Sequence, residues 1–250
     1  AVGSGLLSQY DLVFTWNDDL LSQLNFVKMY LPNSLNYHDP DGFEKRDMFI
    51  SMICGNNPID SNHDAELYSE RYQTIRKLEV CYSNYFHLYG RGWDLPVNKR
   101  SLSFRFLRKT AWMWQPWYRP FPSYRGMTEN KYDVYKRSRF AICYENCMGY
   151  SGYISEKIFD VMSAGCVPVY LGAKNIEDYV PNDCFIDRRS FKTLDDLVTH
   201  LISIDEQSFL RMQENIFRFL KSDMGQRFSA EFFAKKVTEK IVQHVKLQAC

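Results

Sequence analysis

The sequence lacks any long hydrophobic run. No stretch of about 18 consecutive apolar residues occurs, which is roughly the length that a membrane-spanning helix needs. No positively charged and then apolar leader opens the chain, and none of its asparagines stands in an Asn-x-Ser/Thr context. We therefore expect no integral membrane segment in this chain, and either a soluble protein or one whose anchor has been removed.

A charge excess of either sign is also missing. The 250 residues include 31 Lys and Arg against 30 Asp and Glu, which leaves a formal net charge of +1. Without an overall positive field, binding of a nucleic acid would require a local basic patch, so we expect no nucleic-acid partner.

The sequence contains no obvious pattern of metal ligands. Its histidines form no pair, and its cysteines are scattered through a chain that is large enough to fold without disulfides. Cys143 and Cys147 come closest to a pair, but no histidine or third cysteine lies near them, which disfavours zinc. We expect no metal site, and we interpret the cysteines as reduced, buried thiols (Cys54, Cys81, Cys143, Cys147, Cys166, Cys184 and Cys250).

Apolar runs and helical periodicities alternate along most of the chain. This alternation is typical of an α/β fold in which crossover helices join the strands of a parallel sheet. Residues 20–32 read as mixed helix or loop, and the polar stretch 33–47 is the best candidate for a linker. The predicted strands are 9–16, 48–54, 85–90, 140–145, 166–171 and 184–188, and the predicted helices are 63–84, 131–139, 155–164, 174–179 and 194–203, with two more after Asp205 that break near 222–227.

The chemistry concentrates where the strand ending near residue 145 passes into the helix that starts after Ser155. In an open parallel sheet, ligands bind at the carboxyl ends of the strands, and the free amides of a helix N-terminus attract anions. Ser155 is the expected N-cap of this helix. Lys157 in the first turn opposes the helix dipole unless an anion lies between them, and Glu156 could accept hydrogen bonds from ribose hydroxyls. Taken alone, the pair fits a solvated first turn better, with Glu156 complementing the helix dipole and Lys157 incidental.

A family resemblance favours the first interpretation. Residues 139–191, "RFAICYENCMGYSGYISEKIFDVMSAGCVPVYLGAKNIEDYVPNDCFIDRRSF", closely resemble the donor-binding segment of family 10 glycosyltransferases, the α1,3/4-fucosyltransferases. The resemblance lies in an aromatic-Glu-Asn turn, a Tyr-x-Thr-Glu-Lys helix start, an Ala-Gly-x-Val-Pro strand start and a later Pro…Ser-Phe. Upstream, "YSERYQTIRKL" (68–78), "YGRGW" (89–93) and "YRGMTENKYDVYKRSRF" (124–140) resemble family segments more weakly.

The resemblance implies roles for individual residues. Arg71 and Lys157 would grip the diphosphate of a nucleotide sugar, and Glu156 would bind the ribose. Asn146 and Tyr153 would line the donor sugar and phosphate. Ser155 replaces the family's usual threonine and keeps the hydroxyl, whereas the gap between Asn146 and Tyr153 is about one residue longer than in bacterial relatives.

The resemblance also implies a general base, a carboxylate near the end of an N-terminal strand. The corresponding residue would be Asp18 or Asp19 in "DLVFTWNDDLL", where the family usually presents glutamate. A role for "NDD" in capping a turn is an equally good interpretation.

The expected fold is GT-B-like: a Rossmann-like parallel sheet with flanking helices and a short or reduced N-terminal acceptor part. We expect residues 1–45 to form that reduced part with its linker, residues 46–225 the nucleotide-sugar-binding domain, and residues 226–250 a C-terminal helix. The location implied is cytoplasmic, or the Golgi lumen for a catalytic fragment without its anchor.

The expected activity is the transfer of a sugar, with inversion, to a hydroxyl of a glycan acceptor. The first candidate is fucose from GDP-fucose, and we expect no resident cofactor and no metal. Two alternatives stay open. Another donor such as UDP-xylose could be used, because exostosin-like xylosyltransferases share the Ala-Gly-Cys-Val-Pro style of strand start. The chain could also be an inactive glycan- or nucleotide-binding module that kept the fold.

Two further stretches allow competing interpretations. "DPD" (39–41) imitates an Asp-x-Asp metal clamp but lies in a loop with Pro40 and Gly42, so we interpret it as a turn. Residues 105–125 interleave basic and aromatic side chains. Such a pattern fits a stacking platform for single-stranded nucleic acid, a membrane-surface element, an acceptor-sugar surface, or an insertion with its tryptophans packed inward.

Overall fold

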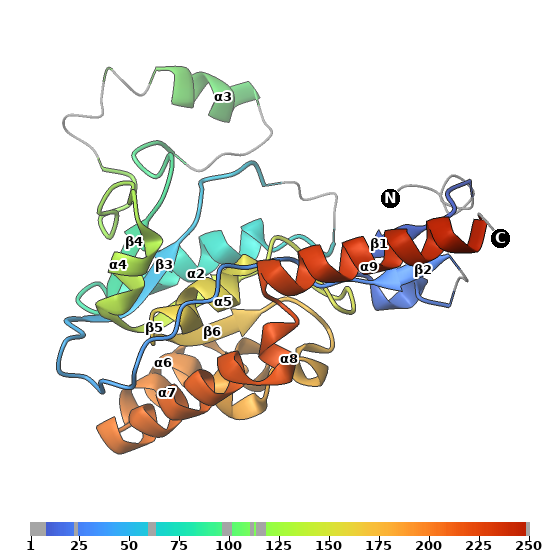
Figure 1. Ribbon diagram of the computed structural model, residues 1–250. Helices are drawn as coiled ribbons and strands as arrows, with labels where there is room; N and C mark the ends of the chain where they lie inside the picture. The colour runs from blue at the N-terminus through green and yellow to red at the C-terminus, as the bar shows by residue number, and fades with distance from the viewer. Residues whose placement is uncertain are drawn as a thin grey trace.

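The computed structural model describes residues 9–22, 25–59, 64–96, 102–110, 113 and 119–248. Its core is a five-stranded parallel sheet in the order β4-β3-β5-β6-β7 (Figure 1). The predicted Rossmann-like sheet with flanking helices is therefore confirmed. The strands are β3 (Met48–Ile53), β4 (Phe86–Tyr89), β5 (Ser138–Tyr144), β6 (Val167–Leu171) and β7 (Ile186–Asp187).

The chain winds outward in both directions from β3. β4 lies on one side of β3 and β5 on the other, so right-handed crossovers place the connecting helices on opposite faces of the sheet. On one face, α4 packs against α5, and α5 packs against α7. On the other face lie α2 and α6, where the hydroxyl of Tyr82, the residue after α2, donates a hydrogen bond to Asp195 in α6. The helices are α2 (Tyr68–Cys81), α4 (Lys131–Lys136), α5 (Glu156–Ser163), α6 (Leu194–Ser203) and α7 (Glu206–Lys221); α3 (Leu102–Lys109) lies outside this arrangement (Figure 1).

The central strands carry almost no polar surface. All residues of β6 are buried, and six of the seven in β5 are buried. This pattern follows from helices on both faces, because such strands read as continuous apolar runs rather than alternating ones. The sheet is thus a rigid base for the loops at its carboxyl edge.

A second, two-stranded parallel sheet precedes the core. β1 (Val13–Thr15) was expected as a strand, but β2 (Phe26–Lys28) falls in the stretch predicted as helix or loop. Three residues are too short to show a periodicity, and β2 is defined by its pairing with β1. Between them a short 3₁₀ turn, η1 (Asp18–Leu20), follows Asn17, whose side chain accepts a hydrogen bond from the Asp19 amide at 3.0 Å.

The chain ends in helices, as predicted after Asp205. α7 is followed by the short α8 (Asp223–Gln226) and the long α9 (Ala230–Gln248). The start of α9 is joined to the N-terminal part, because Asn33 exchanges backbone hydrogen bonds with Phe228 and Ala230 at 2.8 and 3.0 Å. Among the described helices, none combines the length and the hydrophobicity that crossing a bilayer requires. The helix expected over 174–179 is only a 3₁₀ turn, η3 (Ile176–Asp178).

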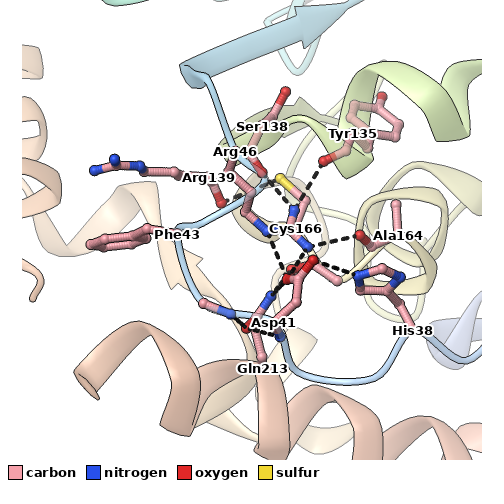
Figure 2. Close-up of polar contacts among 12 residues, drawn as sticks. His38, Asp41, Phe43, Arg46, Tyr135, Ser138, Arg139, Ala164, Cys166 and Gln213 are labelled. Atoms are coloured by element: carbon pink, nitrogen blue, oxygen red, sulfur yellow. Dashed lines mark hydrogen bonds and ion pairs between the residues drawn. The ribbon is translucent and has the colours of Figure 1, made fainter. Parts of the chain in front are cut away.

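The predicted linker is fixed to the amino edge of the sheet by a cluster that we call the linker clamp: His38, Asp41, Arg46 and Gln213 (Figure 2). The Arg46 guanidinium bonds the Asp41 carboxylate at 2.9 and 3.1 Å and the carbonyls of Tyr135, Ser138 and Ala164 at 2.8 to 3.2 Å. Gln213 donates to the same carboxylate oxygen at 2.9 Å. The second aspartate of "DPD" is thus held by protein donors, and the described residues contain no group of three or more His, Cys, Asp or Glu that could hold a metal ion.

The cysteines only partly match the expectation of buried thiols. None of the six in the described part of the chain forms a disulfide, but Cys81 is exposed, and Cys54 and Cys147 are partly exposed. Cys81 is the last residue of α2, where the helix surface meets solvent. Cys250 lies outside the described residues.

Candidate functional site

A pocket of about 330 Å³ opens at the carboxyl edge of the sheet. The ends of β3 and β5 and the residues that follow β3, β4 and β5 line it together with the start of α5, two residues of α4 and one residue of α2. The neighbouring strands β3 and β5 are the point where the winding of the sheet reverses, and open α/β sheets bind ligands at such a switch point. The pocket therefore lies where the topology predicts a ligand.

Arg71 enters this pocket from α2 while almost fully buried, with 4% of its surface exposed. One terminal nitrogen donates to the Tyr144 carbonyl at 2.7 Å and to the Asn146 side-chain oxygen at 3.0 Å. Its Nε is buried without a hydrogen-bond partner. A buried donor without a partner is costly, and a bound ion is one explanation for such a group.

Asn146 is oriented by that contact. Because its Oδ1 accepts from Arg71, its amide nitrogen remains as the donor of this side chain. Asn146 lines the pocket directly after β5 and Glu145. Arg71 therefore both faces the pocket and sets the direction of a second donor.

Lys157 lies in the first turn of α5, as expected. The Ser155 hydroxyl caps this helix by accepting from the Lys157 amide at 3.5 Å, which confirms the expected N-cap. The Lys157 ammonium bonds the Ser155 hydroxyl at 2.9 Å and the Glu145 carboxylate at 3.1 Å, and Glu156 lies 3.8 Å away. Lys157 and Glu156 both line the pocket.

Four of the predicted site residues thus come together around one cavity. Arg71, Asn146, Glu156 and Lys157 all line it, although the two cations lie 86 positions apart in the sequence. With Arg91 and Lys131 the lining has four basic side chains against the carboxylates of Glu156 and Asp160. The excess of positive charge suits a dianionic or trianionic ligand.

Ser155 and Tyr153 lie beside the pocket rather than in its lining. Tyr153 packs its ring against Trp16 with the ring centroids 4.8 Å apart. Burial raises the pKa of the Tyr153 phenol to about 12, so the hydroxyl stays protonated and can donate. Its predicted contact with the donor sugar stays a prediction.

Asp18 occupies a different place, at the junction of β1–β2 with the loop around residue 152. Its carboxylate accepts from Lys28 at 2.5 Å, Tyr179 at 2.6 Å and Asn175 at 3.1 Å. Burial would raise the pKa of this carboxyl, but the three hydrogen bonds outweigh it and hold the pKa below its usual value. Asp18 is thus ionised but already satisfied by protein donors, and Asp19 is exposed.

Gly152 shows how closely the two parts approach at this junction. It adopts a φ of 77°, and a Cβ there would stand 2.4 Å from the Trp16 carbonyl and 2.9 Å from the Asp18 carboxylate. Only glycine fits such an approach at little strain.

Sequence reasoning missed Glu145. It directly follows β5, none of its side chain is exposed, and it holds both Ser155 and Lys157. The signal was the glutamate of the "YEN" turn, which was used for the family resemblance but given no role of its own.

Cys54 lines the pocket, as Cys143 does. Burial raises the pKa of Cys54 to about 11. It therefore stays a neutral thiol at neutral pH, and nothing in the geometry assigns it a reaction.

Part of the chain matches a protein-family model. Residues 97–214 match the family model described as "Glycosyltransferase family 10 (fucosyltransferase) C-term". This segment belongs to glycosyltransferase family 10. It contains Asn146, Glu156 and Lys157, whereas Arg71 and Asp18 lie before it.

Two curated relatives illustrate the sequence match. The chain is 31% identical over 74 residues to the alpha-(1,3)-fucosyltransferase FucT of Helicobacter pylori, and 35% identical over 74 residues to the mouse enzyme 4-galactosyl-N-acetylglucosaminide 3-alpha-L-fucosyltransferase 9. Each match covers 29% of this chain, and 15% and 20% of the relatives' own lengths. The chain thus spans only a small part of these relatives.

The fold has solved counterparts. A crystal structure of an alpha1,3-fucosyltransferase matches 95% of this chain and 66% of its own chain, with a TM-score of 0.52 and 17% sequence identity. At this identity the match shows the fold alone, and with it the predicted GT-B-like class is confirmed. Part of the basic and aromatic stretch 105–125 lies outside the described residues, including Trp112, Trp114 and Trp117.

Proposed function

We propose that this chain acts as a glycosyltransferase that moves a sugar from a GDP-sugar to a hydroxyl of a glycan, with inversion at the anomeric carbon of the sugar. Fucose is the first candidate for that sugar. The observation that carries the proposal is the meeting of Arg71 and Lys157 in one pocket at the switch point of the sheet. The match of residues 97–214 to the family model and the names of the relatives support the choice of fucose.

The diphosphate is the part of the donor that this pocket suits. As the bond to the sugar breaks, negative charge grows on the leaving diphosphate, and fixed positive groups lower the barrier by stabilising it. The Arg71 guanidinium, the Lys157 ammonium and the amino end of α5 are such groups. Each charged hydrogen bond contributes about 1.5 to 3 kcal/mol, so together they can supply a substantial part of a typical enzymatic rate acceleration.

The ribose would lie against Glu156. The Glu156 side chain is half exposed at the pocket, and its carboxylate lies 3.8 Å from the Lys157 ammonium. Its oxygens can therefore accept hydrogen bonds from the vicinal hydroxyls of a ribose. Asn146 would donate its amide to a phosphate oxygen, since Arg71 fixes its other end.

A second candidate function is nucleotide-sugar binding without turnover. The observation that favours it is the state of Asp18, whose carboxylate is satisfied by Lys28, Asn175 and Tyr179 and has a lowered pKa, which makes it a weak base. Under the first proposal Asp18 would have to release a partner when the acceptor binds. Binding of a donor without its turnover would support this second function.

The test is a panel of GDP, UDP, GDP-fucose and UDP-xylose measured by thermal shift, followed by donor hydrolysis and transfer assays. We expect GDP and GDP-fucose to raise the melting temperature more than the uridine compounds, and GDP-fucose to be turned over. Stabilisation by GDP without turnover would support the binding module. A larger shift with UDP compounds would redirect the proposal to another donor, and no shift with any nucleotide would refute both functions.

A further inference from the structure

A buried carboxylate lies behind the pocket. Glu145 directly follows β5, and none of its side chain is exposed. Its two oxygens accept three hydrogen bonds: from the Ser155 amide at 2.7 Å, from the Ser155 hydroxyl at 2.6 Å and from the Lys157 ammonium at 3.1 Å. Every one of these donors belongs to the cap or the first turn of α5.

The Glu145 side chain leaves no room for a larger residue at the neighbouring position 172. A Cβ on Gly172, at the end of β6, would stand 2.4 Å from the Glu145 Cγ and 2.6 Å from the Tyr170 hydroxyl. Burying a carboxylate costs several kcal/mol unless a cation and hydrogen bonds compensate it. Among the described residues, Lys157 provides the only ion pair of Glu145.

Helix capping alone does not account for this arrangement. Ser155 already caps α5, and an N-cap needs a short polar side chain at that position rather than a glutamate from a neighbouring strand. The contact with the Lys157 ammonium contributes nothing to the cap. It does fix the free end of a long, flexible side chain at the edge of the pocket, where 23% of the Lys157 side chain is exposed.

We propose that Glu145 is a positioning residue that holds the Lys157 ammonium in place for a nucleoside diphosphate. A cation whose position is fixed before the ligand arrives stabilises charge without a reorganisation cost. The ammonium has three donors, so it can keep Glu145 and Ser155 and still bond a phosphate oxygen. The inference rests on the proposed function, because a diphosphate is the ligand that Lys157 would meet.

The test compares the affinities of GDP and GMP, measured by calorimetry, in the wild type, E145Q, K157A and the double variant. The ratio of the two dissociation constants, GMP over GDP, reports the contacts of the second phosphate and is insensitive to a general loss of stability. Glutamine keeps one oxygen for the Ser155 amide but offers no charge to Lys157. We expect E145Q to lower the ratio by about 10-fold, the value of one charged hydrogen bond.

The double variant tests whether Glu145 acts through Lys157. We expect E145Q to change the ratio little once Lys157 is already alanine, since coupled residues give non-additive effects. An unchanged or higher ratio in E145Q, or equal effects of E145Q with and without Lys157, would overturn the proposal.

A shorter acid and a distant control complete the design. E145D keeps the charge but withdraws it from Lys157, so we expect it to lower the ratio less than E145Q does. If E145Q does not fold, E145D replaces it in the test, and a wild-type ratio in E145D would then overturn the proposal. D41N removes a partly buried, paired carboxylate at the opposite edge of the sheet, and it should lower stability but leave the ratio unchanged. A wild type that binds GDP no tighter than GMP would refute the diphosphate site itself, whereas a preference for GDP that survives E145Q would refute only the role of Glu145.

Discussion

Two arginines are buried to nearly the same extent at opposite edges of one sheet, Arg46 with 2% and Arg71 with 4% of their surface exposed. At the amino edge, each nitrogen of the Arg46 guanidinium has a partner in Asp41 or in a backbone carbonyl. At the carboxyl edge, Arg71 leaves its Nε without one. Burial alone therefore does not distinguish these two arginines, whereas the hydrogen-bonding state of their nitrogens does.

The acids beside these arginines differ in the same way. Asp41 receives its hydrogen bonds from the linker clamp, which fixes the linker to the sheet. Glu145 receives its bonds from the start of α5, which faces the pocket. One cluster holds the fold together and the other orients groups toward a cavity, so substitutions in the two should have separable effects.

The largest expected effect is a loss of stability from Arg46→Met. Removing one partner of a buried ion pair leaves Asp41 and three carbonyls short of donors, which typically costs about 3 to 5 kcal/mol. Denaturant unfolding should show this loss in the free energy of unfolding. The GDP affinity of the remaining folded protein should stay within about 2-fold of wild type, and a specific loss of GDP binding would break the comparison.

Arg71→Met and Lys157→Ala should act mainly on function. Each removes a cation at the pocket, and losing one group that stabilises developing charge commonly costs about 100-fold in turnover. Steady-state kinetics with GDP-fucose would measure it, with the melting temperature as the control for folding. Wild-type rates in both variants would contradict the assignment of the diphosphate to these two cations.

Asp18→Asn should have a smaller effect on stability, about 1 to 2 kcal/mol at neutral pH, because charged hydrogen bonds to Lys28, Asn175 and Tyr179 are weakened. The pKa of Asp18 is lowered in the folded state, so its stabilisation is present above the usual value of 3.8 and is lost as the pH falls through the folded-state pKa. The stability difference between wild type and variant should therefore vanish in strong acid. If Asp18 is also the base, kcat falls while GDP affinity holds; an unchanged kcat would dismiss that role.

The smallest effect is expected from Lys131→Ala. Lys131 also lines the pocket, but half of its side chain is exposed and it pairs with Asp160 at 2.9 Å. Exposed, paired cations contribute little, so GDP affinity should fall by less than about 5-fold. A loss as large as that of Arg71→Met would show that burial and unsatisfied donors are not what marks the functional cations.

Much of the sheet was predictable, because β3, β5 and β6 are buried on both faces and read as apolar runs, and α5 carries a capping serine at its expected place. β2 was not, since its three residues gain their structure from pairing with β1. Residues 97–214 were recognisable as a family member from local motifs. The division into parts at residues 45 and 225 stays a prediction.

At the site, the sequence predicted which residues line the pocket better than how they are bonded. Arg71, Glu156 and Lys157 could be named because their motifs are local. The satisfied state of Asp18 depends on Asn175 and Tyr179, more than 150 residues away, and no local pattern encodes that contact. Glu145 was visible as a letter in a motif, but its role required knowing that β5 ends beside the first turn of α5.

The most direct test of the central claim is a crystal structure of the chain with GDP bound. We predict that the diphosphate lies in the pocket between β3 and β5, with its oxygens within hydrogen-bonding distance of both the Arg71 guanidinium and the Lys157 ammonium. A nucleotide bound elsewhere, or bound with its phosphates away from these two side chains, would contradict the account.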